Sequence, residues 1–136
     1  MSDIFADTSG FFALLAARDP MHAQADRVLR RAGKRGRRFV TSDYVLDETA
    51  TLLGARGLGH LVPRLFAIVH GSAACRVAWM DPDRFGHSRA LFEQHLGERW
   101  SFTDCSSFVL MRELDLTDVL TTNGHFRAAG FRPLLV

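Results

Sequence analysis

Four polar side chains in this sequence have the types and positions needed to bind a divalent cation. Asp7 and Asn123 each follow a short apolar run, whereas Glu48 and Asp104 lie within segments of helical periodicity. Hard cations such as Mg²⁺ prefer oxygen ligands and usually retain several waters. A cluster of three carboxylates and one amide could therefore hold one or two metals, which would orient a water molecule and neutralise phosphate charge during hydrolysis.

Three of these side chains also have a local structural interpretation. Asp7 could cap a following helix, because Asp side chains accept hydrogen bonds from the free N–H groups of a helix start. Asp104 could form a capping box with Ser101. Asn123 precedes Gly124, and Asn-Gly is a common turn dipeptide. Each residue taken alone therefore admits a structural role, and the metal hypothesis depends on their occurring together.

Glu48 is expected to lie on the apolar side of its helix. It stands three residues after Val45 and four before Leu52, so helical geometry places it on the stripe that these residues form with Thr49 and Leu53. Burying an unpaired carboxylate costs roughly several kcal/mol. A buried Glu48 would therefore need a cation or strong hydrogen-bond donors nearby. A metal site and a buried salt bridge both satisfy this requirement.

Short apolar runs alternate with longer segments of helical period along the whole chain. Strands that alternate with helices indicate an α/β fold with a central, mostly parallel sheet of about five strands flanked by helices. Ligands bind at the carboxyl ends of the strands of such a sheet, where Asp7 and Asn123 are expected. The predicted strands are residues 4–6, 39–41, 77–80, 119–121 and 133–136, and the predicted helices are residues 9–18, 22–34, 43–56, 65–70, 84–96, 103–114 and 124–129.

Size and composition indicate a single globular domain over residues 1–136. The sequence is 47% hydrophobic and 24% charged, which is ordinary for a globular protein. The longest stretch without Asp, Glu, Lys or Arg has 11 residues, from Leu65 to Cys75, and a membrane-spanning helix needs about 20 apolar residues. The N-terminus has acids where a secretory signal has bases, so we expect a cytoplasmic protein. Cys75 and Cys105 are too few for a disulfide framework or a zinc cluster and are expected to be buried free thiols.

Basic residues concentrate in one segment, although the net charge is only +2. Seven of the 17 bases lie between Arg27 and Arg38. Four of them, at helical spacing, form one stripe: Arg27, Arg30, Arg31 and Lys34. The stripe could be a solvated helix face, a surface that contacts the RNA backbone, or a docking surface for an acidic protein segment.

Four motifs in this order resemble the PIN-domain ribonucleases. They are Asp7-Thr8-Ser9, residues 44–49 (Tyr-Val-Leu-Asp-Glu-Thr), residues 102–108 (Phe-Thr-Asp-Cys-Ser-Ser-Phe) and Thr121-Thr122-x-x-His125-Phe126. The resemblance covers nearly the whole chain and implies a single PIN-like domain. It implies that Asp7, Glu48 and Asp104 are metal ligands for Mg²⁺ or Mn²⁺, and that the hydroxyls of Thr8, Ser9, Thr103 and Ser107 orient these acids.

Small PIN proteins of this length resemble the toxins of VapBC toxin–antitoxin pairs. The resemblance implies an endoribonuclease that hydrolyses RNA phosphodiester bonds, forms a homodimer and is silenced by a cognate antitoxin. The family usually has a fourth acid where this chain has Asn123. A catalytically weakened PIN-like module that only binds RNA or antitoxin is therefore the alternative. A receiver-type signalling domain would need a lysine after its last strands, and the only lysine here is Lys34.

Overall fold

The computed structural model describes residues 2–136 and has five parallel strands in the order β3-β2-β1-β4-β5. The central strand β1 (Ile4–Ala6) lies between β2 (Phe39–Ser42) and β4 (Asp118–Leu120). The edge strands are β3 (Cys75–Ala78) and β5 (Arg132–Pro133). The expected α/β class and the parallel five-stranded sheet are confirmed.

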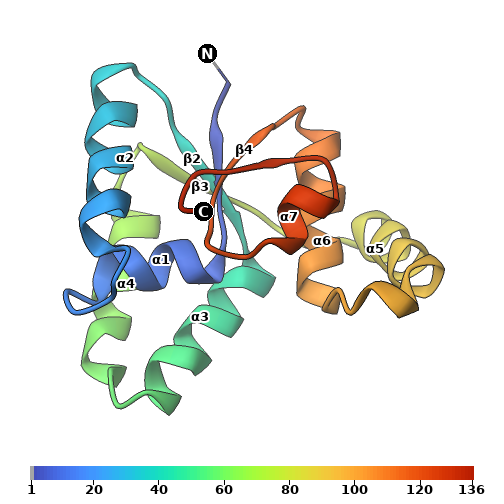
Figure 1. The fold of residues 1–136 in the computed structure, drawn as a ribbon, viewed down its shortest axis with the longest axis horizontal. Helices are drawn as coiled ribbons and strands as arrows, with labels where there is room; N and C mark the ends of the chain where they lie inside the picture. The colour runs from blue at the N-terminus through green and yellow to red at the C-terminus, as the bar shows by residue number, and fades with distance from the viewer. Residues whose placement is uncertain (1) are drawn as a thin grey trace.

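Helices cover both faces of the sheet, as crossover connections between parallel strands require. In Figure 1, α1 (Thr8–Leu15), α2 (His22–Lys34) and α4 (Val62–Gly71) lie to the left of the sheet. On the right lie α5 (Pro82–Gln94), α6 (Phe102–Glu113) and the short α7 (His125–Ala128). The helix α3 (Asp43–Ala55) continues from the end of β2, and two 3₁₀ turns, Gly59–Leu61 and Leu96–Glu98, complete the chain. Within residues 2–136, no helix combines the length and the apolar character needed to cross a membrane.

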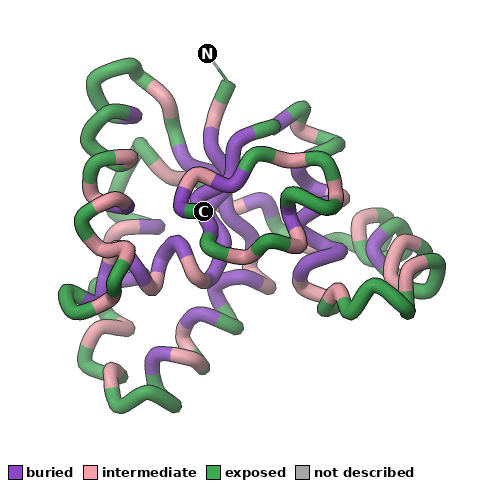
Figure 2. The backbone as a smooth tube through the Cα atoms, viewed as in Figure 1, coloured by how far each residue is buried: buried purple, intermediate pink, exposed green. Residues whose placement is uncertain are grey.

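The core lies along the three central strands, where the backbone is buried on both sides (Figure 2). All residues of β1, β2 and β4 are buried, and α6 contributes the large side chains Phe108, Leu110 and Met111. Cys105 is also buried, Cys75 is partly buried, and both are free thiols. A sheet of short strands buried on both faces reads in the sequence as apolar runs of three or four residues, which is the pattern observed.

Strands are added on both sides of β1, and this positions the candidate site. From β1 the chain builds β2 and β3 on one side and later returns to place β4 and β5 on the other. Strand order reverses at this point, and ligands in open α/β sheets bind in the crevice outside the carboxyl ends of the strands there. Ala6 pairs with Leu120, so the residues that follow β1 and β4 emerge side by side.

Close packing of α1 against β4 depends on Gly10. A Cβ atom at this position would lie 2.1 Å from the carbonyl oxygen of Leu120. Only glycine permits that approach, so the first turn of α1 lies directly against the carboxyl end of β4.

Several predicted boundaries were wrong by a few residues. The helix predicted for residues 9–18 ends at Leu15, because the Asp19 carboxylate accepts a hydrogen bond from the Met21 backbone in a tight turn before α2. The strand predicted for residues 77–80 is Cys75–Ala78, since its register is set by pairing with β2 and the Met80 amide donates to Asp43 instead. The strand predicted for residues 133–136 is only Arg132–Pro133.

Candidate active site

Asp7 is a buried carboxyl group at the end of β1, held by the hydroxyl group of the residue that follows β4. It occupies the N-cap position of α1, but its side chain makes no capping hydrogen bond, so the capping interpretation of Asp7 is wrong. Instead, the Thr121 hydroxyl donates to Oδ2 of Asp7 at 2.8 Å. Asp7 is 4% exposed. The carboxylate therefore points toward Thr121, beyond the carboxyl ends of β1 and β4.

A chain of hydrogen bonds fixes the hydroxyl that holds Asp7. The Thr121 hydroxyl donates its proton to Asp7, so it acts as an acceptor toward its other two partners. It accepts from the Ser9 hydroxyl at 2.9 Å and from the backbone N–H of Asn123 at 3.0 Å. Ser9 in turn accepts from the backbone N–H of Thr122 at 2.9 Å. The series of hydrogen bonds runs from the backbone N–H groups that follow β4, through the two hydroxyls, to Asp7. The backbone after β4 therefore sets the orientation of the Asp7 carboxylate.

The electrostatic surroundings of Asp7 disfavour its charged form. Burial raises the pKa of Asp7 from 3.8 to about 7, although the hydrogen bond from Thr121 opposes this shift. The carboxylates of Asp104 and Glu48 lie near enough to raise the pKa further. A carboxyl group with two other acids nearby would be stabilised in its charged form by a cation.

Asp104 lies at the start of α6 and accepts hydrogen bonds from three groups. It forms a reciprocal capping box with Ser101, so the predicted capping role is confirmed. Its Oδ2 also lies 3.1 Å from Nδ1 of His125, and its Oδ1 accepts from the Asn123 side-chain amide at 3.2 Å. Asp104 is therefore joined both to its own helix and to the segment that follows β4.

Asn123 forms the predicted turn and also contacts the acid cluster. Its side-chain oxygen accepts from the His125 backbone N–H at 2.9 Å, which makes the turn expected for Asn-Gly. Its side-chain nitrogen donates to Asp104, so the same residue reaches the acid cluster. The side-chain oxygen of Asn123 is thus hydrogen-bonded within the turn, and its side-chain nitrogen is hydrogen-bonded to the Asp104 carboxylate.

Glu48 differs from expectation, because its side chain is exposed rather than buried. The buried face of α3 consists of Val45, Leu46, Thr49 and Leu53, and Glu48 lies at the border of this stripe. It still contributes a repulsive charge to Asp7, so it faces the site from the solvent side. The expected cost of burying its carboxylate does not arise.

The supporting hydroxyls fall into two groups. Thr8 joins α1 to α3, because it accepts from the Thr49 hydroxyl at 3.2 Å and donates to the Val45 carbonyl at 3.5 Å. Ser9 belongs to the chain that holds Asp7, as described above. Ser107 donates to the backbone carbonyl of Thr103 at 3.0 Å and so bonds within its own helix rather than to Asp104.

Thr121 is the site residue that sequence analysis did not single out. Thr121 is the first residue of the motif at residues 121–126, but its type and spacing alone indicate no role. The signal that could have found it is the pairing of β1 with β4, since the residue after Leu120 must then lie beside the residue after Ala6.

Asp118, at the other end of β4, belongs to a different network. It is buried and paired with Arg37 and Arg132, each with a closest contact of 2.8 Å or less. Burial acts to raise the pKa of Asp118, but hydrogen bonds from Arg132 and Arg37 hold it below its usual value. This carboxylate is a structural ion-pair partner and lies away from the acid cluster.

The predicted basic stripe lies on the exposed face of α2. Arg27, Arg30, Arg31 and Lys34 are all exposed, and Arg30 pairs with Asp26 one turn earlier at 2.7 Å. Arg27 and Arg31 lie near Ile4, the first residue of β1, so the stripe is separate from the acid cluster beyond the other end of that strand.

No family model matches the chain. The chain is 34% identical over 128 residues to "23S rRNA-specific endonuclease VapC20" of Mycobacterium tuberculosis, from strains CDC 1551 and H37Rv, covering 94% of this chain and 95% of that protein. The chain belongs to the VapC-type PIN-domain toxins.

The fold agrees with this VapC assignment. The crystal structure of Mycobacterium tuberculosis VapC20, described as a sarcin–ricin loop cleaving toxin, superposes with a TM-score of 0.85 at 32% identity. The match covers 95% of this chain and 96% of the VapC20 chain. The resemblance noted from the four sequence motifs is therefore confirmed.

Proposed function

We propose that this VapC-type chain is a metal-dependent endoribonuclease and the toxin of a toxin–antitoxin pair. The observation that carries the proposal is the buried Asp7, oriented by Thr121 and flanked by Asp104 and Glu48 at the edge where an α/β sheet binds ligands. A perturbed carboxyl group in a crevice is typical of a functional site.

The donor set fits a hard divalent cation such as Mg²⁺ or Mn²⁺. Among residues 2–136, no three His, Cys, Asp or Glu side chains are gathered closely enough to bind a metal by themselves. Mg²⁺ in proteins often uses only one or two carboxylates and keeps several waters. Asp7 and Asp104 would hold the ion, with Glu48 acting directly or through water, and bound there it would neutralise phosphate charge and activate water.

The residues around the acids then have positioning roles. Thr121 and Ser9 keep Asp7 in one orientation, and Asn123 and His125 do the same for Asp104. His125 is part-exposed, and as an imidazolium it would donate from both ring nitrogens, one to Asp104 and the other to an RNA phosphate. Rigid support of this kind holds catalytic groups in productive geometry before the substrate arrives.

The proposal also covers the substrate class, the partners and the cellular location of the chain. VapC20 cleaves the sarcin–ricin loop and is specific for 23S rRNA, and we propose structured RNA as the substrate class of this chain. We also propose a homodimer, a cognate antitoxin that silences it, and a cytoplasmic location.

The test is cleavage of a sarcin–ricin loop oligonucleotide by the purified chain in Mn²⁺ or Mg²⁺ and in EDTA. Asp7→Asn and Asp104→Asn should each reduce cleavage at least about 100-fold, because each removes a negative charge that would hold the metal ion. Glu48→Gln should reduce cleavage less than these two. Asp47→Asn is the matched control, since Asp47 is the exposed neighbour of Glu48 on α3, and it should cleave like the wild type. Full cleavage in EDTA, or a cleavage rate of the Asp7→Asn variant within a few-fold of the wild-type rate, would contradict the proposal.

A second candidate is a weakened module that binds RNA without cleaving it. The observation that favours it is Asn123, which presents an amide to Asp104 where the family usually has an acid. Tight RNA binding with no metal-dependent cleavage would identify this second function.

A further inference from the structure

A pocket of about 340 Å³ lies between α2 and β5, at the opposite end of the sheet from the acid cluster. Ile4, the first residue of β1, lines this pocket, whereas Asp7 follows the last. At about 3.3 Å per strand residue, the pocket wall and Asp7 are roughly 10 Å apart along the strand. The pocket is therefore a separate site, although it is close to the candidate active site.

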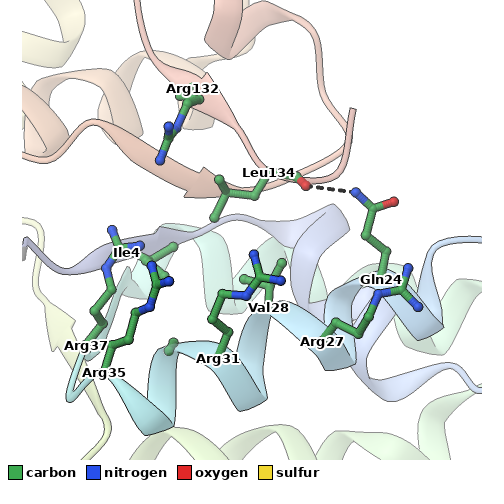
Figure 3. Close-up of a pocket in the computed structure, with 10 residues that line it drawn as sticks. Ile4, Gln24, Arg27, Val28, Arg31, Arg35, Arg37, Arg132 and Leu134 are labelled. Carbon is green, nitrogen blue, oxygen red and sulfur yellow. Dashed lines mark hydrogen bonds between the residues drawn. The ribbon is translucent and has the colours of Figure 1, made fainter.

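Five arginines line the pocket, so its charge is strongly positive. Arg27, Arg31 and Arg35 are exposed side chains of α2 and its C-cap, and Arg37 follows them in the chain. Figure 3 shows Arg132 on the facing strand, across the pocket from this row. No acid is among the lining residues in the part of the chain that the structure describes. Counting the nearby Asp118, the excess is four positive charges.

Asp118 holds two of the five guanidinium groups in place. Arg37 donates to Asp118 at 2.8 Å and to the Ser2 carbonyl at 2.8 Å, while Arg132 binds both carboxylate oxygens of Asp118. The Arg132 side chain nevertheless stays 66% exposed. A cation that is ordered before binding loses less conformational entropy when a ligand arrives.

The side chains between the arginines of the pocket are mostly apolar. Ile4, Val28 and Leu134 line it between the arginines, and the Gln24 side chain donates to the Leu134 carbonyl at 3.1 Å. Figure 3 shows this hydrogen bond bridging α2 and the strand segment. A pocket of this volume, with cations on both of its sides, suits a small anionic group rather than the broad face of a partner.

We propose that this arginine pocket is a phosphate-binding site, which takes the phosphate groups of a nucleotide or of an RNA strand. The guanidinium fork pairs with phosphate oxygens in a bidentate way. A terminal phosphate group carries up to about two charges and three acceptor oxygens, whereas a carboxylate and each phosphodiester of an RNA strand carry one charge and two free oxygens. The linked phosphates of a nucleotide or of an RNA end therefore neutralise four excess charges within this volume, which an acidic peptide segment does less compactly.

The first arm of the test measures pyrophosphate binding to the wild-type chain by calorimetry in EDTA. Arg31→Gln/Arg35→Gln removes two pocket charges without touching the Asp118 network. Arg64→Gln/Arg89→Gln removes two exposed charges from α4 and α5 and is the matched control. We expect one pyrophosphate per chain, a loss of at least about tenfold in affinity for the pocket variant, and less than about threefold for the control. Absence of binding, or equal losses in both variants, would overturn the proposal.

The second arm separates the two sources of phosphate, using Asp7→Asn chains so that RNA stays intact. If an RNA strand fills the pocket, the pocket substitutions weaken binding of the sarcin–ricin oligonucleotide and flatten its salt dependence, by about 0.7 to 0.9 in slope per lost contact. If a free nucleotide fills it, ATP competes with pyrophosphate while RNA binding is unchanged. A Glu-rich peptide with the same charge as pyrophosphate serves as a further competitor. If it binds the pocket as tightly as pyrophosphate does, the occupant is an acidic protein segment and the phosphate assignment is overturned.

Only the RNA arm rests on the proposed function. Pyrophosphate binding in EDTA requires neither cleavage nor a metal, so failure of the nuclease proposal leaves the first arm intact. Circular dichroism of both double variants, whose substituted side chains are exposed, checks that the fold is retained.

Discussion

At the residue scale, Asp7 is a carboxyl group whose pKa is raised to about 7, mainly because burial removes it from water. In the unfolded chain the same group ionises near 3.8. Between these two values the unfolded state loses its proton first. The free energy of unfolding contributed by Asp7 therefore falls as pH rises from about 4 to about 7, and is constant above that range.

Asp7→Asn should remove this pH dependence. We expect the variant to gain stability relative to wild type as pH rises from 5 to 7.5, by up to about 1.4 kcal/mol per pH unit, because Asn stays neutral. Urea denaturation in EDTA at several pH values measures the difference. An equal difference at pH 5 and pH 7.5 would show that burial does not perturb this carboxyl group.

Asn123→Asp should place a new negative charge beside Asp104, because the replaced amide now donates to that carboxylate. We expect tighter Mn²⁺ binding and, without metal, a lower melting temperature from the added repulsion. Calorimetry and thermal denaturation measure the two effects. If Mn²⁺ affinity stays the same, the side chain serves only the turn with His125 and should be dropped as a candidate ligand.

At the scale of elements, Gly10→Ala should be among the most damaging small substitutions in the chain. The new Cβ would lie 2.1 Å from the Leu120 carbonyl oxygen, so α1 must move away from β4. We expect a loss of at least about 2 kcal/mol in unfolding free energy and weaker cleavage, since Ser9 moves with the helix.

Gly54→Ala is the matched control for that substitution. Gly54 lies in α3 with open space around its missing Cβ, so alanine should stabilise the helix by about 0.5–1 kcal/mol. Equal melting temperatures for Gly10→Ala and wild type would contradict the close approach of α1 to β4.

The elements show which features a sequence can predict. The bounds of α2 were predicted correctly because a charged outer face and a small inner face, at Ala25 and Ala32, mark the helix clearly. The bounds of β3 were not, because pairing with β2 sets its register and local periodicity does not encode that pairing.

The same distinction holds for the candidate site. Asp7 and Asn123 could be placed at one sheet edge because each ends an apolar strand. The contact of Thr121 with Asp7 depends on which strands are neighbours, and the exposure of Glu48 depends on which residues of α3 pack inward. Neither follows from spacing alone.

At the scale of the whole molecule, metal binding should stabilise the fold by mass action. Saturating Mn²⁺ should raise the melting temperature of the wild-type chain by several degrees, because it would relieve repulsion among the acids around Asp7. Asp7→Asn should show a much smaller rise. Equal shifts in the two proteins would mean that Mn²⁺ acts elsewhere.

The bond between Thr121 and Asp7 joins residues 114 positions apart in the chain. During synthesis at about 5–20 residues per second, on the order of 6 to 20 s separates the translation of one partner from that of the other. Throughout that interval the first motif exists without the hydroxyl that orients its acid and without the second half of the sheet. A nascent or truncated chain that stops before β4 therefore cannot assemble the site, so a cell that makes this protein is exposed to its activity only after β4 and Thr121 have been translated.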